Sequence, residues 1–198
     1  MTLQDSSLIR AATKQDGLAL AKLIDIAGEG IPSWVWGKLC GDGQAPLTIG
    51  TERARRETGG FSYTHALLAQ QNGHPAGMVL SYPLLAGPQD DPDDLPAPIA
   101  PFVELEKHSV DTWFINALAV FASHRNAGIG QRLIAAAEGL ARSNGYARMS
   151  IQVYEQNSGA VRLYERLGYK RANRASVRHH PCQPYYTGDV LLLIRQLG

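Results

Sequence analysis

Six consecutive residues have the types and spacing of an anion-binding turn: Arg125-Asn126-Ala127-Gly128-Ile129-Gly130. They follow an apolar run and open a stretch with helical spacing. Glycines allow a ligand to approach the backbone closely, and the free N–H groups and dipole of a helix start favour negative charge. Arg125 adds a fixed cation beside them. The turn could therefore hold a diphosphate, although by itself it fits a ligand-free strand-to-helix turn equally well.

The surrounding motifs resemble those of the GNAT acetyltransferase superfamily. Its acyl-CoA signature, Arg/Gln-x-x-Gly-x-Gly/Ala, matches Arg125 to Gly130 at every specified position, and Leu118-Ala119-Val120 ends the preceding strand as the family's Leu-Ala-Val does. A later helix carries a pattern like Asn-x-x-Ala-x-x-Leu-Tyr-x-x-x-Gly-Phe/Tyr, in the residues Asn157, Ala160, Leu163, Tyr164, Gly168 and Tyr169. The close resemblance covers about Trp113 to Lys170, and the N-terminal third agrees only in its order of elements.

The resemblance implies acetyl-CoA as co-substrate. The backbone of Leu118 and Val120 would hold the acetyl carbonyl and the pantetheine arm, and the N–H groups of Ala127 to Gln131 would hold the diphosphate. Asn157 would contact the cofactor past its diphosphate. The expected cofactor-binding residues are thus Leu118, Ala119, Val120, Arg125, Asn126, Ala127, Gly128, Ile129, Gly130, Gln131 and Asn157.

Acetyl transfer from a thioester to an amine needs a neutral amine, a donor to the developing oxyanion and a proton for the departing thiolate. Spacing alone favours a core role for Tyr164, which lies on the apolar stripe of its helix. The resemblance instead implies that Tyr164 faces the thioester sulfur as the general acid.

The general base is not identified. Many family members carry a glutamate six residues before the valine of Leu-Ala-Val, where this chain has Phe114, and the nearby Asn116 is no base either. Four ionisable residues precede the strand and could act directly or through water, but each is more typical of a solvated loop. They are Glu104, Glu106, His108 and Asp111.

The resemblance places the amine acceptor against two segments, Gly28–Gly43 and Arg178–Gly188. Their aromatic side chains could stack on a ring or a cation, or simply pack the rim or a dimer contact. These segments contain Trp34, Trp36, His179, His180, Cys182, Tyr185 and Tyr186. The close His179-His180-Cys182 spacing lacks a fourth ligand, so no metal site is expected.

The remaining pattern indicates a mixed α/β protein. Strands are expected near Leu8–Ala11, His65–Gln70, Ala76–Pro83, Thr112–Val120, Arg148–Val153 and Asp189–Arg195, with an Asn72-Gly73 hairpin turn. Helices are expected over Asp16–Ala27, Ile31–Cys40, Thr48–Thr58, Gly128–Ser143 and Asn157–Leu167. The proline- and aspartate-rich segment Gly87–Pro101 should be an irregular loop, whose run Asp90–Asp94 is either solvated or attractive to a cationic amine. By resemblance, the fold class is a GNAT-like α/β (α+β) fold. It has a mixed, mostly antiparallel sheet of six to seven strands flanked by helices, with a splayed central strand pair, in one domain over residues 1–198.

The composition limits the classes of partner that the protein is expected to bind. With 198 residues, 44% hydrophobic and 19% charged residues, the chain has the profile of a soluble globular protein. A net charge of +1 gives no bulk attraction to nucleic acid or to a membrane surface. The polar N-terminus and the absence of a long apolar run favour the cytoplasm. A small-molecule amine is the default acceptor, and a homodimer, frequent in the family, is compatible with the sequence.

Two other functions remain open. A nucleotide-binding oxidoreductase of Rossmann type would use Gly128 and Gly130, with Glu155 as the ribose-binding acid. Against it, Leu133 occupies the third glycine position, and the 43 residues after Glu155 are too few for a second half-fold. The second alternative is a non-catalytic acyl-CoA-binding module with the same fold, which the absent strand glutamate would suit.

Overall fold

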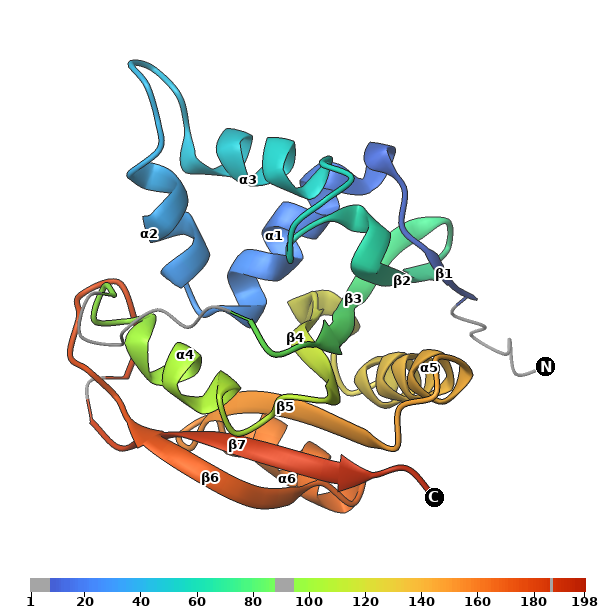
Figure 1. Ribbon diagram of the computed structural model, residues 1–198. Helices are drawn as coiled ribbons and strands as arrows, with labels where there is room; N and C mark the ends of the chain where they lie inside the picture. Colours follow the sequence, from blue (N-terminus) through green and yellow to red (C-terminus); the bar gives the residue numbers. More distant parts are fainter. Residues whose placement is uncertain (1–7, 88–94, 186) are drawn as a thin grey trace. The chain divides into compact units, whose positions relative to one another are not determined.

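The computed structural model describes residues 8–87, 95–185 and 187–198. It has a seven-stranded sheet in the order β1-β2-β3-β4-β5-β7-β6, accompanied by six α-helices (Figure 1). The strands are β1 (Leu8–Ala11), β2 (Ala66–Gln71), β3 (His74–Leu84), β4 (Thr112–Val120), β5 (Arg148–Tyr154), β6 (Lys170–Ser176) and β7 (Asp189–Gln196). The helices are α1 (Gly17–Ala27), α2 (Ile31–Gly37), α3 (Pro46–Ala54), α4 (Ala100–Glu106), α5 (Ile129–Ser143) and α6 (Ser158–Arg166). The predicted mixed, mostly antiparallel fold is confirmed.

The described chain forms two compact units. Among the described residues, the first contains 8–28, 32–81 and 117–137, and the second contains 29–31, 82–87, 95–116, 138–185 and 187–198. β3, β4 and α5 each have residues in both units.

The first unit contains the β1-β2-β3 meander and the α1–α3 pair. β2 and β3 are antiparallel and are joined at Gln71 and His74, as the Asn72-Gly73 turn predicts. Both turn residues have positive φ, 52° and 79°, which is the geometry of a type I′ hairpin turn. Helix α1 packs against α3, and its buried residues include Leu20, Leu23 and Ile24.

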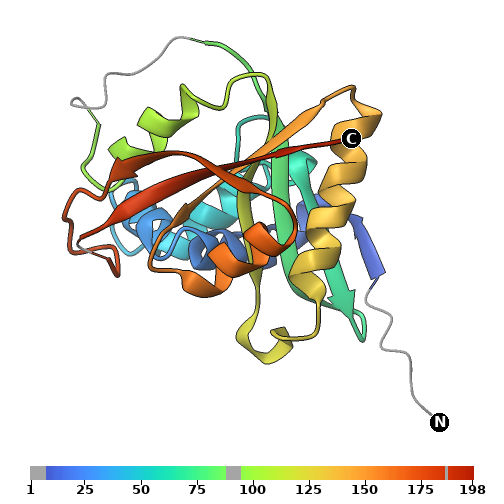
Figure 2. The same ribbon diagram turned by 90° about the horizontal axis from the view of Figure 1, so that it is seen from below.

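The second unit is built on the antiparallel β5-β7-β6 strands, with β7 in the middle (Figure 1). Figure 2 shows that the loop 177–188, which connects β6 to β7, lies at the opposite end of these strands from the C-terminus. Helix α4 packs on β6 and β7. A cluster of Leu105, Tyr154, Ala175, Val190 and Leu192 forms an apolar core of this unit.

β4 pairs in parallel with β5 through Trp113–Ile115 and Met149–Ile151, and both strands then continue, to Val120 and Tyr154. A buried hydrogen bond between the Thr112 and Ser150 hydroxyls (2.5 Å) joins the same two strands. The short paired region agrees with the splayed central pair expected from the sequence.

Most sequence-predicted elements are present, with shifts of a few residues at their ends. Two elements were missed. Strand β6 was assigned no structure, and α4 begins inside the segment Gly87–Pro101 that was expected to be an irregular loop. Pro101 lies in the first turn of α4, where its missing N–H costs nothing because no intrahelical partner exists there. The predicted acidic run Asp90–Asp94 lies outside the described residues.

Candidate active site

The acyl-CoA signature forms an exposed turn between β4 and α5. Asn126 and Gly128 both have positive φ, 62° and 73°, so the backbone takes left-handed conformations just before the helix starts. The N–H groups of Ile129, Gly130 and Gln131 belong to the first turn of α5, where helical geometry supplies no acceptor. The turn therefore presents donors and a helix N-terminus to solvent, as a diphosphate site requires.

Hydrogen bonds join the end of β4 to this turn and to β3. The Arg125 Nε donates to the Val120 carbonyl at 3.2 Å, and the Phe121 N–H donates to the Ala76 carbonyl at 2.9 Å. Gly77 on β3 lies so close that a Cβ there would be 2.9 Å from the Ala119 carbonyl oxygen and 3.2 Å from the Ile129 Cγ2. The first unit thus brings together Leu118 to Val120 and the signature turn.

In the second unit, Tyr164 lies on α6 and is only 5% exposed. Its ring packs 6.1 Å from the ring of Tyr169, centroid to centroid. Burial and the nearby charge of Glu29 raise the pKa of Tyr164 well above the usual value for a phenol. The hydroxyl is therefore protonated at neutral pH and can donate a proton or a hydrogen bond.

Asn157 caps α6 as predicted, because its Oδ1 accepts from the Ala160 N–H at 3.2 Å. Its Nδ2 donates to the Glu29 carboxylate at 2.9 Å. Contact of Asn157 with a cofactor remains a prediction, and the amide already has two partners in the structure.

Glu29 is the residue that sequence reasoning missed. It lies between Gly28 and Gly30 and has a φ of 51°, a left-handed conformation that costs a non-glycine residue about 1–2 kcal/mol. The carboxylate is half-buried and hydrogen-bonds to both Asn157 and Tyr185. Burial raises its pKa, against the opposing effect of these two donors. The available signal was a large charged residue at a position in a turn where glycine would be the unstrained choice.

Of the first segment expected to face the acceptor, residues Glu29–Ile31 belong to the second unit, and there they meet the second segment. A Cβ on Gly30 would be 3.1 Å from the Cys182 carbonyl oxygen, and Glu29 hydrogen-bonds to Tyr185. The buried Gln183 amide donates to the carbonyls of Arg178 and Tyr185, at 2.8 and 3.1 Å, and so fixes this part of the loop.

The aromatic residues of these segments have different surroundings. In the first unit, Trp36 is 2% exposed and packs against Gly50, so it belongs to the core, whereas the Lys38 ammonium lies 3.8 Å over the ring of Trp34. Tyr185 packs on Tyr154 with ring centroids 5.0 Å apart. Tyr186 lies outside the described residues. Among the residues that the structure describes, no group of three His, Cys, Asp or Glu side chains is arranged to hold a metal ion.

The four ionisable residues considered as bases lie in or after α4. Glu106 is the most buried, and burial raises its pKa. Its charge acts on Tyr82, which packs edge-on against Phe114 at 6.0 Å between ring centroids. Phe114, at the strand position where the resemblance implies a glutamate, is 2% exposed. No role as base follows for Glu104, His108 or Asp111 from their surroundings.

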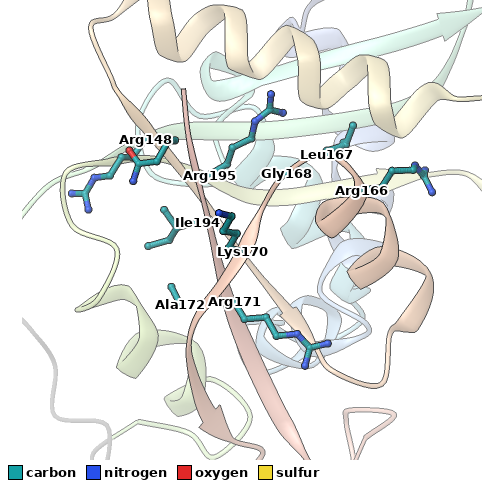
Figure 3. A pocket seen from close by; sticks show the side chains of 10 residues that line it. Arg148, Arg166, Leu167, Gly168, Lys170, Arg171, Ala172, Ile194 and Arg195 are labelled. Atoms are coloured by element: carbon teal, nitrogen blue, oxygen red, sulfur yellow. The ribbon is translucent and has the colours of Figure 1, made fainter. Parts of the chain in front are cut away.

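A groove of about 720 Å³ lies in the second unit (Figure 3), and neither Tyr164 nor Glu29 lines it. It is lined by Arg148, Arg166, Leu167, Gly168, Lys170, Arg171, Ala172, Ile194, Arg195 and Gln196. Figure 3 shows Arg148, Arg166 and Arg171 pointing outward in different directions. Arg171 pairs with Glu155 and Glu165, and Arg195 pairs with Glu138. These cations do not converge on one point, so the groove is not built as an anion site.

The comparisons with known proteins agree with this geometry. A model of the acetyltransferase (GNAT) family matches residues 38–169, so the chain belongs to that family. An acetyltransferase crystal structure aligns with a TM-score of 0.67 and 21% identity, covering 97% of this chain and all of that one. An N-acetyltransferase from Staphylococcus aureus Mu50 aligns with a TM-score of 0.67 and 20% identity, over 96% of this chain and 100% of that chain.

The yncA protein of Salmonella typhimurium, solved with its cofactor acetyl-CoA, aligns with a TM-score of 0.60 and 18% identity, covering 98% of this chain and 95% of that one. At these identities the solved structures establish the fold. No curated protein matches the chain. No helix among the described residues is long and apolar enough to cross a membrane.

Proposed function

We propose that this protein transfers the acetyl group of acetyl-CoA to a primary amine of a small molecule, and that the whole chain acts as one N-acetyltransferase domain. The observation that carries the proposal is the turn Arg125–Gly130. Its left-handed residues and exposed helix start supply the donors that a diphosphate needs, in the acyl-CoA signature of the family. The yncA structure with acetyl-CoA supports the choice of co-substrate.

In the proposed reaction, the backbone of Leu118 to Val120 holds the acetyl carbonyl and the pantetheine arm. The turn with Arg125 to Gln131 holds the diphosphate, and Asn157 contacts the cofactor beyond it. The amine nitrogen attacks the thioester carbon, the carbon–sulfur bond breaks, and Tyr164 donates its proton to the departing thiolate. The phenol is protonated at neutral pH, and it gives its proton to sulfur as it accepts one from the attacking nitrogen, so no free phenolate has to form.

The testing experiment is release of free CoA thiol from acetyl-CoA in the presence of single amines, namely spermidine, tyramine, lysine and an alanyl dipeptide. Amine-dependent release above the rate without enzyme is the expected result. Acetyl-CoA binding is measured separately by calorimetry. Tight binding without thiol release from any of these amines would favour a non-catalytic acyl-CoA-binding module, and absence of binding would overturn both.

A further inference from the structure

The canonical strand position for a base is apolar in this chain, because Phe114 is buried there. The proposed reaction still has to remove a proton from an ammonium before the nitrogen can attack. We propose that Glu29, in the turn after α1, is the group that accepts this proton. This inference rests on the proposed function.

The position of Glu29 relative to Tyr164 is the first argument. Its negative charge is close enough to raise the pKa of the Tyr164 hydroxyl, and it acts in the same way on Tyr154 and Tyr185. Glu29 also accepts a hydrogen bond, at 2.9 Å, from Asn157, the N-cap of the helix that carries Tyr164. If Tyr164 faces the thioester sulfur, the carbonyl carbon is one bond from that sulfur, so the attacking nitrogen must arrive beside α6, the helix whose cap holds Glu29.

The construction of the Glu29 position is the second argument. The backbone has left-handed geometry at Glu29 (φ 51°) and at Gly30 (φ 92°), which carries the carboxylate toward the loop 177–188 rather than to solvent. The Asn157 amide and the Tyr185 hydroxyl each hold it by a hydrogen bond. Asn157 and Tyr185 are thus positioning residues, since they orient a carboxylate that would otherwise turn to water.

The environment suits a base. Among the described residues, Glu29 accepts hydrogen bonds from the Asn157 amide and the Tyr185 hydroxyl, and its charge raises the pKa of Tyr154 and Tyr164. No arginine or lysine is among the groups that shift its pKa. A carboxylate without a paired cation keeps its capacity to take a proton from an entering ammonium, and its charge attracts that ammonium.

Every proton in the proposed acetyl transfer is accounted for. An ammonium gives one proton to Glu29, and the neutral nitrogen forms the bond to the thioester carbon. As the carbon–sulfur bond breaks, the Tyr164 proton passes to sulfur, and the second nitrogen proton returns to the Tyr164 oxygen. Glu29 then loses its proton to solvent. The net products are an amide, CoA thiol and one released proton.

Glu165 provides the control, because it is a carboxylate on the same helix as Tyr164, but it is exposed, pairs with Arg171 and is not among the charges that act on Tyr164. Thiol release is measured for the wild type, Glu29→Gln and Glu165→Gln with two acceptors. One is the most active alkylamine of the panel, which is protonated at pH 7, and the other is hydroxylamine, which is largely neutral.

Glu29→Gln should lower kcat with the alkylamine by about 10²–10³-fold and with hydroxylamine by less than about tenfold. The acidic limb of the kcat/KM pH profile should disappear, while acetyl-CoA affinity and the Glu165→Gln rates stay near the wild-type values. An equal loss with both acceptors, or a normal rate in Glu29→Gln, would overturn the role of Glu29 but not the proposed function. If the wild-type protein releases no thiol with either acceptor, the proposed function and this inference are both overturned.

Folding is checked by thermal unfolding of each variant. If Glu29→Gln does not unfold cooperatively, Glu29→Asp replaces it, because aspartate keeps the carboxylate and tolerates positive φ better. A shorter carboxylate should lower kcat with the alkylamine while keeping the acidic limb. Loss of that limb in Glu29→Asp, with acetyl-CoA still bound, would count against the proposal.

Discussion

Two features of its surroundings keep the Tyr164 phenol protonated: its burial in α6 and the negative charge of Glu29. An ordinary surface tyrosine would have neither. In the proposed reaction, this protonated phenol is the donor to the forming thiolate, and such a donor lowers the energy of the transition state. The same residue is also a core residue by exposure, so its packing and its chemistry are not alternatives.

Replacing Tyr164 with Phe should lower kcat by about 10²-fold or more, because a general acid contributes on this order, while acetyl-CoA affinity changes little. Steady-state kinetics and calorimetry measure the two quantities separately. Tyr169→Phe is the control, since Tyr169 is also buried and its hydroxyl donates to the Met149 sulfur at 3.7 Å. An unchanged kcat in Tyr164→Phe would remove Tyr164 from the mechanism.

At the scale of elements, the close approach of β3 to the end of β4 sets the position of the signature turn, Arg125–Gly130. Gly77 makes this approach, and any side chain there would meet the Ala119 carbonyl oxygen at 2.9 Å, the Val120 Cγ2 at 3.1 Å and the Ile129 Cγ2 at 3.2 Å. Backbone atoms cannot move aside without shifting β4 or the first turn of α5. The glycine thus sets the geometry of a site that it does not itself contact.

Gly77→Ala should therefore weaken acetyl-CoA binding by about tenfold or more and destabilise the fold by about 1–3 kcal/mol, the usual cost of overpacking. Calorimetric titration and urea unfolding provide the two measurements. Gly139→Ala is the control, because a Cβ at Gly139 meets nothing within 4 Å and alanine favours the α5 helix. Equal acetyl-CoA affinity in wild type and Gly77→Ala would show that the strand end does not set the turn.

The connection from β1 to α1 depends on a buried ion pair. Both guanidinium nitrogens of Arg10 donate to the Asp16 carboxylate at 2.8 Å, and the Thr13 N–H and hydroxyl donate to the same group. These interactions lower the pKa of Asp16 to about 2. Because the pKa is lower in the folded state, the pair stabilises the fold above about pH 4, and this contribution is lost as the pH falls toward 2.

Asp16→Asn should consequently lower the free energy of unfolding at pH 7 by about 2 kcal/mol, since each pKa unit corresponds to about 1.4 kcal/mol. The difference from wild type should shrink on going from pH 5 to pH 2. Urea unfolding across this range tests the sign. A difference that is constant with pH would mean that packing, and not the ionised pair, accounts for the loss.

Periodicity and caps predicted the elements whose signal is local. The apolar stripe of α5, the Asn157 cap and the Asn72-Gly73 turn are all where the sequence placed them. α4 and β6 were missed for physical reasons. Three prolines, Pro96, Pro98 and Pro101, mask the start of α4, and β6 reads as a polar, basic run (Lys170–Ser176) whose only fully buried residue is Ala175. Its strand conformation comes from pairing with β7, a tertiary effect.

The candidate site also has one part that the sequence could predict and one part that it could not. The signature turn could be predicted because its glycines and arginine are contiguous in the chain. Glu29 could not, because its importance comes from Asn157, 128 positions later, and from Tyr185 in the loop before β7. A contact of that sequence separation leaves no periodic or motif-level trace in a single sequence.

At the scale of the whole molecule, binding of the proposed ligand is linked to folding. A ligand that binds the folded chain and not the unfolded chain stabilises the native state by mass action.

Acetyl-CoA at about 100 times its dissociation constant should therefore add about 2.7 kcal/mol to the free energy of unfolding and raise Tm by about 5–10 °C in one cooperative transition. Gly128→Glu is the control: it puts a negative side chain at a left-handed position in the diphosphate turn, and it should abolish the shift. NAD should produce no shift, since the third glycine of a dinucleotide fingerprint is Leu133 here. A rise in Tm with NAD and none with acetyl-CoA would reverse the choice of ligand, while a normal acetyl-CoA shift in Gly128→Glu would move the diphosphate to another part of the chain.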